Sequence, residues 1–106
     1  MMKYYLALCI LNALFLISCS GSLPEPTSEQ VQWASNKWSG ISISELSEGR
    51  NLYIDKCSGC HSLKDPSGYT EEEWGPVLKK MSRKAKLTDA EYEKISHYIS
   101  TMSKRQ

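Results

Sequence analysis

The chain lacks an excess of charge of either sign. Its 106 residues include 13 lysines and arginines against 12 aspartates and glutamates, which gives a formal net charge of +1. Proteins that bind nucleic acids usually carry a basic excess, so we expect no nucleic-acid partner. The length is sufficient for one small domain.

Strand patterns and internal repeats are also lacking. Only residues 41–44 alternate between apolar and polar side chains, and that stretch is short. Helix starts are frequent by contrast, because capping boxes, in which Ser or Thr precedes Glu or Gln by three positions, begin at Thr27, Thr70 and Thr88. The predicted fold class is therefore all-α.

Two positions inside the predicted helices are unusual. Gly49 lies within a helix expected over residues 44–57, where glycine costs about 1 kcal/mol relative to alanine, so close approach by another helix is expected there. Pro76 lies within the helix that follows Thr70, and we expect either a kink or a helix that starts at Pro76. The last helix is expected to bury one face, formed by Tyr92, Ile95, Ile99 and Met102.

No apolar run is long enough to be a comfortable membrane span. The longest covers residues 4–17, follows Lys3, and ends in Leu-Ile-Ser-Cys at residues 16–19. This ending resembles the bacterial lipobox, which implies that residues 1–18 are a lipoprotein signal peptide and that Cys19 receives the lipid. An uncleaved N-terminal anchor helix is the alternative. Either arrangement attaches the protein to a membrane and places its folding outside the cytoplasm.

The expected location is the periplasmic space or cell envelope. Ser20 replaces the aspartate that retains some lipoproteins at the inner membrane, which favours the outer membrane. Residues 21–28 are rich in proline, serine and glycine and are predicted to form a flexible tether. Residues 19–43 would then comprise the lipidated N-terminus, the tether and a short helix that packs across the domain through Trp33 and Trp38.

Cysteines are few, and one pair carries a motif. Of the four, two fall in the apolar run and at the lipid site, which leaves Cys57 and Cys60 and no structural disulfide. They belong to the pentapeptide Cys-Ser-Gly-Cys-His, the pattern of c-type haem attachment. Each thiol can add across one haem vinyl group, and His61 can then ligate the iron. Attachment of this kind occurs outside the cytoplasm, in agreement with the export signal.

Two other functions use a Cys-x-x-Cys pair. A zinc site needs four ligands, and only His97 remains to complete one, because the chain has no second cysteine pair. A thiol–disulfide motif is expected at the start of a helix beside a βαβ unit, whereas this motif follows a helix and strands are lacking. Haem attachment is the interpretation that we carry forward.

Residues 44–103 resemble a small class I-type cytochrome c domain. The shared features are a helix with an internal glycine, the haem motif, an aromatic last helix, and a tryptophan followed seven residues later by a methionine, here Trp74 and Met81. The resemblance implies a cytochrome c domain over residues 44–106, in which three to four helices wrap around one covalently bound haem c. The first and last of its helices would cross at Gly49.

The usual long methionine-bearing loop is missing, so the sixth iron ligand has to come from elsewhere. Met81 is the predicted ligand, because it shares a helical stripe with Trp74. Met102, His97 and an open sixth position are the alternatives. In class I cytochromes a proline carbonyl fixes the proximal histidine, and Pro66 is the candidate here.

The predicted ligand set defines a function. A thioether favours ferrous iron, and six-coordinate iron has no position for substrate, so the chain is predicted to carry single electrons rather than to be an enzyme. The alternatives are a haem enzyme or gas sensor with an open sixth position, and a structural haem subunit that contacts a larger oxidoreductase through Trp33 and Trp38. A run of basic residues without an acidic one comprises Lys79, Lys80, Arg83, Lys84 and Lys86. It is either a solvated helix end or a docking surface for an acidic redox partner.

Overall fold

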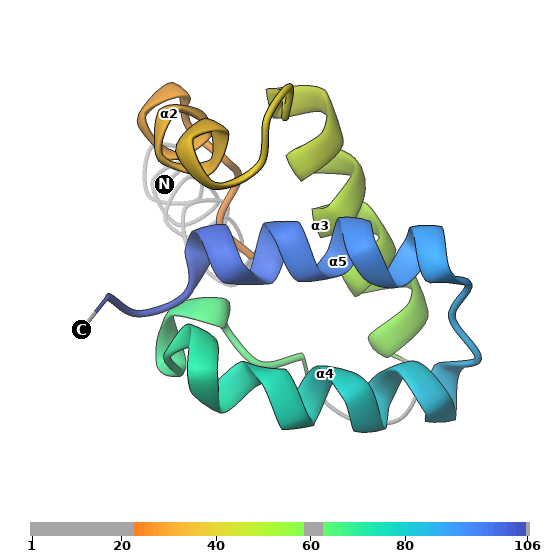
Figure 1. Cartoon of the computed structure of the whole chain (residues 1–106). Coiled ribbons are helices and arrows are strands. Elements are labelled where there is room, and N and C mark those ends of the chain that lie inside the picture. Colours follow the sequence, from red (N-terminus) through yellow and green to blue (C-terminus); the bar gives the residue numbers. More distant parts are fainter. Residues whose placement is uncertain (1–22, 59–62, 106) are drawn as a thin grey trace, which may run out of the picture.

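The computed structural model describes residues 23–58 and 63–105. Within those ranges the chain is helical and contains no strand, which confirms the all-α fold class for the part described (Figure 1). The elements in chain order are α2 (Ser28–Lys37), α3 (Ile43–Cys57), the 3-10 helix η1 (Pro66–Gly68), α4 (Glu71–Ala85) and α5 (Asp89–Met102).

Side-chain caps fix where the helices begin. The predicted capping boxes open α2 at Thr27, α4 at Thr70 and α5 at Thr88. Helix α3 begins slightly earlier than expected, because the Ser42 hydroxyl accepts a hydrogen bond from the Glu45 amide at 3.2 Å and caps the helix. A cap of this kind stabilises a helix by about 1 kcal/mol.

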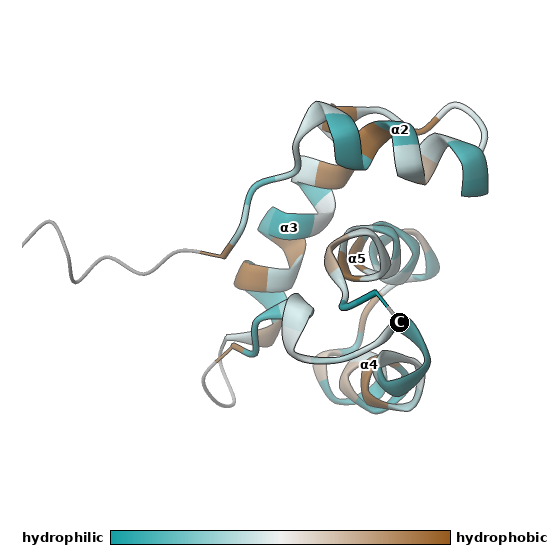
Figure 2. Cartoon of the chain, turned by 90° about the vertical axis from the view of Figure 1, so that its left-hand side faces the viewer, coloured by the Kyte–Doolittle hydropathy of each residue, from teal (hydrophilic) through white to brown (hydrophobic). Residues whose placement is uncertain are grey.

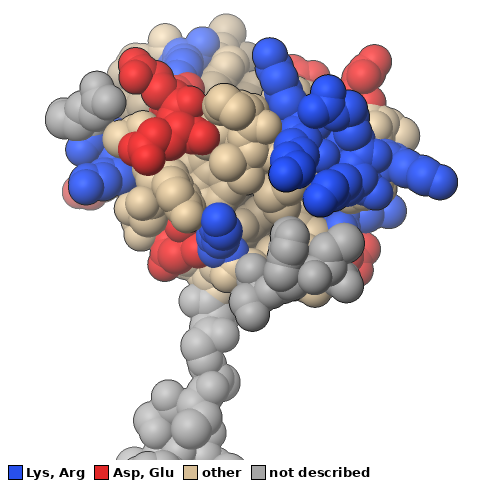
Figure 3. Space-filling view, turned by 90° about the horizontal axis from the view of Figure 1, so that it is seen from below, with Lys and Arg blue, Asp and Glu red and all other residues tan. Residues whose placement is uncertain are grey.

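Helix α4 runs through its internal proline. It begins at Glu71 and contains Pro76, so the expectation of a helix that starts at Pro76 is wrong. Its first turn carries three glutamates and its last turn Arg83 and Lys84, an order that complements the helix dipole. Acidic and basic side chains consequently gather on opposite sides of the face seen in Figure 3.

Helices α3 and α5 cross in close contact at Gly49, as predicted. A Cβ atom placed on Gly49 would lie 2.1 Å from the carbonyl oxygen of Lys94 and 2.9 Å from Cβ of Tyr98. No larger residue fits there without moving one helix. This contact explains the glycine within α3, and α3 packs more extensively against α5 than against any other described element.

Two apolar clusters hold the helices together. The smaller joins α2 to the rest of the molecule, with Ala34, Ile41 and Leu46 buried and Trp33 and Trp38 packed against them. Both tryptophans stay partly exposed, and their role as a contact surface for a larger oxidoreductase remains a prediction. The larger cluster comprises Tyr53, Cys57, Trp74, Leu78, Ile95, Tyr98, Ile99 and Met102.

The segment before α2 departs from the predicted flexible tether. From Leu23 onward it is docked on the domain, and we call residues 23–26 the N-terminal strap. The Leu23 carbonyl accepts hydrogen bonds from Arg50 Nε at 3.2 Å and Nη2 at 3.0 Å, and the Pro24 carbonyl accepts one from the Tyr98 hydroxyl at 2.7 Å. Pro26 is buried. The tether expectation is therefore wrong for these residues, because side chains distant in sequence bind their carbonyl groups.

Candidate functional site

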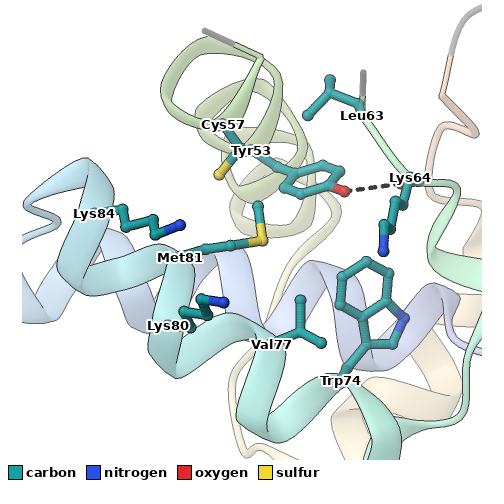
Figure 4. Close-up of a pocket in the computed structure, with 9 residues that line it drawn as sticks. All are labelled: Tyr53, Cys57, Leu63, Lys64, Trp74, Val77, Lys80, Met81 and Lys84. Carbon is teal, nitrogen blue, oxygen red and sulfur yellow. Dashed lines mark hydrogen bonds between the residues drawn. The ribbon is translucent and has the colours of Figure 1, made fainter. Parts of the chain in front are cut away.

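A cavity of about 240 Å³ lies between α3 and α4. The thiol of Cys57 comes from the last residue of α3, and the thioether of Met81 comes from α4. Figure 4 shows both sulfur atoms directed into the space between the two helices. The complete lining is Tyr53, Cys57, Leu63, Lys64, Trp74, Val77, Lys80, Met81 and Lys84.

The structure brings together two of the site residues predicted from the sequence. Cys57 is buried, with 6% of its surface exposed, and Met81 is partly buried against the same core cluster. Met81 lies two helical turns beyond Trp74, so both side chains face the cavity from α4. Cys60 and His61, like Cys19, lie outside the described residues.

The other candidate iron ligands lie elsewhere. The His97 ring stacks on Trp38 with 4.2 Å between the ring centroids, and it lines a separate groove between α4 and α5. Met102 is buried in the core and does not line the cavity. Among these three side chains, only Met81 shares a cavity with Cys57. The same placement separates His97 from the cysteine with which it would have to hold zinc.

The carbonyl of Pro66 already has two donors. Trp74 Nε1 donates to it at 2.8 Å within the core, and the Tyr69 amide donates at 3.4 Å. A carbonyl oxygen has two lone pairs, so these bonds use the acceptor that was expected to fix His61. The expectation for Pro66 therefore loses support. Sequence analysis missed this role of Trp74, which ties the segment after the motif to α4.

Tyr53 makes the corresponding bond from α3. Its hydroxyl donates to the Lys64 carbonyl at 2.8 Å, as drawn in Figure 4, and the side chain is 1% exposed. Burial raises the pKa of Tyr53 to about 12, so the hydroxyl stays neutral and remains a donor over the ordinary pH range. The chain that leaves the motif is thus held at Lys64 by α3 and at Pro66 by α4.

Part of the basic run borders the cavity. Lys80 and Lys84 line it from α4, and Lys64 lines it from the segment after the motif. Lys79, Arg83 and Lys86 are exposed nearby on the same helix or at its end. None of the five residues of the run forms an ion pair with another described residue. Their charges are therefore available to an anionic ligand or partner.

The chemistry of the lining fits haem. Aromatic and aliphatic side chains supply apolar walls for a flat macrocycle, Met81 offers a soft sulfur ligand, and Cys57 offers a thiol for covalent attachment. The lysines at the margin suit carboxylate groups. With Cys60 and His61 supplied by the motif, the chain has every residue type that c-type attachment requires.

Comparison with protein-family models, with curated proteins and with solved structures finds no match to this chain. The assignment of a cofactor therefore depends on the motif and on the cavity beside it. In the described ranges, no helix has both the length and the apolar character needed to cross a membrane.

Proposed function

We propose that the chain is a lipid-anchored, monohaem c-type cytochrome that carries single electrons between redox partners outside the cytoplasm. The observation that supports this most strongly is that Cys57, the first residue of the haem motif, shares a cavity with Met81. Bound haem c would supply a one-electron iron couple. The role is that of an electron carrier and not of an enzyme.

The residues of the cavity would have separate tasks. Cys57, with Cys60 of the motif, would hold the cofactor covalently, and Met81, with His61 of the motif, would ligate the iron. A thioether ligand raises the reduction potential relative to a second histidine. Leu63, Trp74 and Val77 line the cavity and limit the access of water.

The lysines around the cavity would guide partners. Lys80 and Lys84 lie at its margin, where their charges attract an acidic redox protein toward the cofactor. Such docking is fast and weakens as salt screens the charges. The lipid on Cys19 would hold the protein at a membrane of the cell envelope.

Covalent haem is the direct test of this proposal. The full chain, with its signal, is produced in cells that carry out c-type haem maturation, and the purified protein is weighed by mass spectrometry. Relative to the polypeptide that begins at Cys19, we expect the mass to be higher by one haem and by the lipid on Cys19. Cys57→Ala and Cys60→Ala should each lose one thioether link, whereas Ser58→Ala, between them, should keep both. A chain that matures without haem, or that carries zinc instead, would refute the proposal.

A further inference from the structure

The N-terminal strap, residues 23–26, is bonded across the two helices that form the rigid crossing. Arg50 on α3 binds the Leu23 carbonyl through two nitrogen atoms, and Tyr98 on α5 binds the Pro24 carbonyl. Tyr98 is fully buried at 0% exposure, and Leu23 packs against the main core cluster. The described chain thus begins beside α3 with its main chain already held in place (Figure 2).

The strap shortens the free chain between the lipid and the domain. Three residues lie between Cys19 and Leu23, so four Cα-to-Cα steps join the two, and a fully extended chain of that length reaches about 14 Å. If the strap were detached, the free chain would run from Cys19 to the start of α2 at Ser28 and could reach about 32 Å. Docking of the strap therefore cuts the maximum separation by more than half.

We infer that the strap is a spacer that holds the domain against the lipid surface. The inference rests on the proposed lipid attachment at Cys19. A domain held so closely can reach a membrane-bound partner only where the docking site of that partner lies near the same surface. A long flexible tether would instead let the domain reach docking sites that stand further from the membrane.

The test measures the distance between cofactor and membrane. Lipidated, haem-loaded full chain is inserted into vesicles whose headgroups carry a fluorophore, which haem quenches by energy transfer at short range. The reference is a variant with about 20 Gly/Ser residues inserted between Gly21 and Ser22, a coil of about 25 Å. We expect strong quenching by the unaltered protein and a marked loss of quenching in the insertion variant.

Release of the strap should reproduce that loss. Arg50→Met combined with Tyr98→Phe removes the donors that hold the Leu23 and Pro24 carbonyls. Thr101→Val is the matched control, because it also removes a buried hydroxyl that donates to a carbonyl, but that carbonyl belongs to His97, and Thr101 does not line the cavity. Quenching should fall in the double variant and stay at the original level in the control.

A second measurement does not depend on membranes. Pro24 and Pro26 lie within the strap, and a proline-specific endoprotease should cut after them faster in the double variant than in the unaltered protein or in Thr101→Val. Equal quenching by the unaltered and insertion proteins, or equal cleavage in all of them, would overturn the spacer while leaving the cytochrome proposal intact. A purified chain that lacks haem or lipid by mass spectrometry would overturn both.

Discussion

Helix α3 meets α5 and α4 in opposite ways. Against α5 the backbones touch, since a Cβ atom on Gly49 would lie 2.1 Å from the Lys94 carbonyl oxygen. Against α4 the side chains stand apart around a cavity of about 240 Å³, with Cys57 on one wall and Met81 on the other. One helix thus carries both a close backbone contact and a wall of the candidate site.

The contrast separates residues that fix the fold from residues that perform chemistry. Cys57 lies eight residues after Gly49, about 12 Å further along the helix. The crossing holds the axis of α3 and so helps to fix the position of the thiol at the end of that helix. Changes at the crossing should therefore alter stability, while changes around the cavity should alter the cofactor or its partners.

The largest expected effect is at the crossing. Gly49→Ala should lower the free energy of unfolding by about 3 kcal/mol or more, because the methyl group meets a backbone carbonyl that cannot move alone. Gly75→Ala in α4 is the control, since its Cβ would have no neighbour within 4 Å, and its effect should stay within about 1 kcal/mol. Denaturant unfolding of the full chain compares them. Equal losses in the two variants would show that the crossing is not close-packed.

The next largest effect is expected from the charge of a lysine that borders the cavity. Lys80→Glu should lower the rate of oxidation by ferricyanide, a small anion, by about tenfold at low ionic strength, because Lys80 borders the cavity. Lys104→Glu changes the net charge equally but lies away from the cavity, next to Trp33 and Thr70, and should change the rate much less. Stopped-flow measurements at low and high salt test this. Equal slowing by both variants would mean that net charge, and not its position, sets the rate.

Two buried tyrosines predict how stability depends on pH. Burial raises the pKa values of Tyr53, at the cavity, and Tyr98, at the crossing, from 10.0 to about 12. The folded chain holds both protons more tightly than the unfolded chain, so stability is complete below pH 10 and falls as the pH rises toward 12.

Each Tyr→Phe variant should lose about 1 kcal/mol at neutral pH, through the missing hydrogen bond, and should fall less steeply in alkali. Unfolding curves of each variant and of the unaltered protein, measured at neutral pH and between pH 10 and 12, give the two free energies of unfolding to compare. An unchanged alkaline slope in the Tyr53→Phe, Tyr98→Phe double variant would contradict this account.

The smallest expected effect is that of an ion pair at the crossing of α3 and α5, where it tests whether charge stabilises the contact between the two helices. Lys94 Nζ lies 2.7 Å from Glu48 Oε2, but the two side chains are 41% and 52% exposed. Exposed pairs contribute little because solvent screens them, so Lys94→Gln should lower stability less than any variant above, and the difference should vanish in high salt. A loss as large as that of Gly49→Ala would mean that charge, and not packing, holds the crossing.

The sequence predicted those features that depend on nearby residues. The starts of α2, α4 and α5 follow from capping boxes confined to four positions, and the crossing at Gly49 follows from the cost of glycine inside a helix. The continuation of α4 through Pro76 was not settled by these local signals. For the site, Met81 was predicted because it shares a helical stripe with Trp74, and the structure places Met81 across the cavity from Cys57.

Features that depend on distant side chains could not be predicted. The strap looks flexible by composition, and its donors Arg50 and Tyr98 come from two other helices. The Pro66 carbonyl is bound by Trp74, and His97 is held by Trp38, through contacts for which the sequence carries no periodic signal. Each of these contacts requires the tertiary fold before its two partners can be matched.

The ferric absorption spectrum of the haem-loaded full chain tests the central claim most directly. A far-red sulfur-to-iron charge-transfer band should be present, should disappear in Met81→Leu, and should persist in Met102→Leu, where the buried methionine of α5 is replaced at similar volume. A band that survives in Met81→Leu, or that is lost in Met102→Leu, would show that the cavity between α3 and α4 does not supply the sixth ligand.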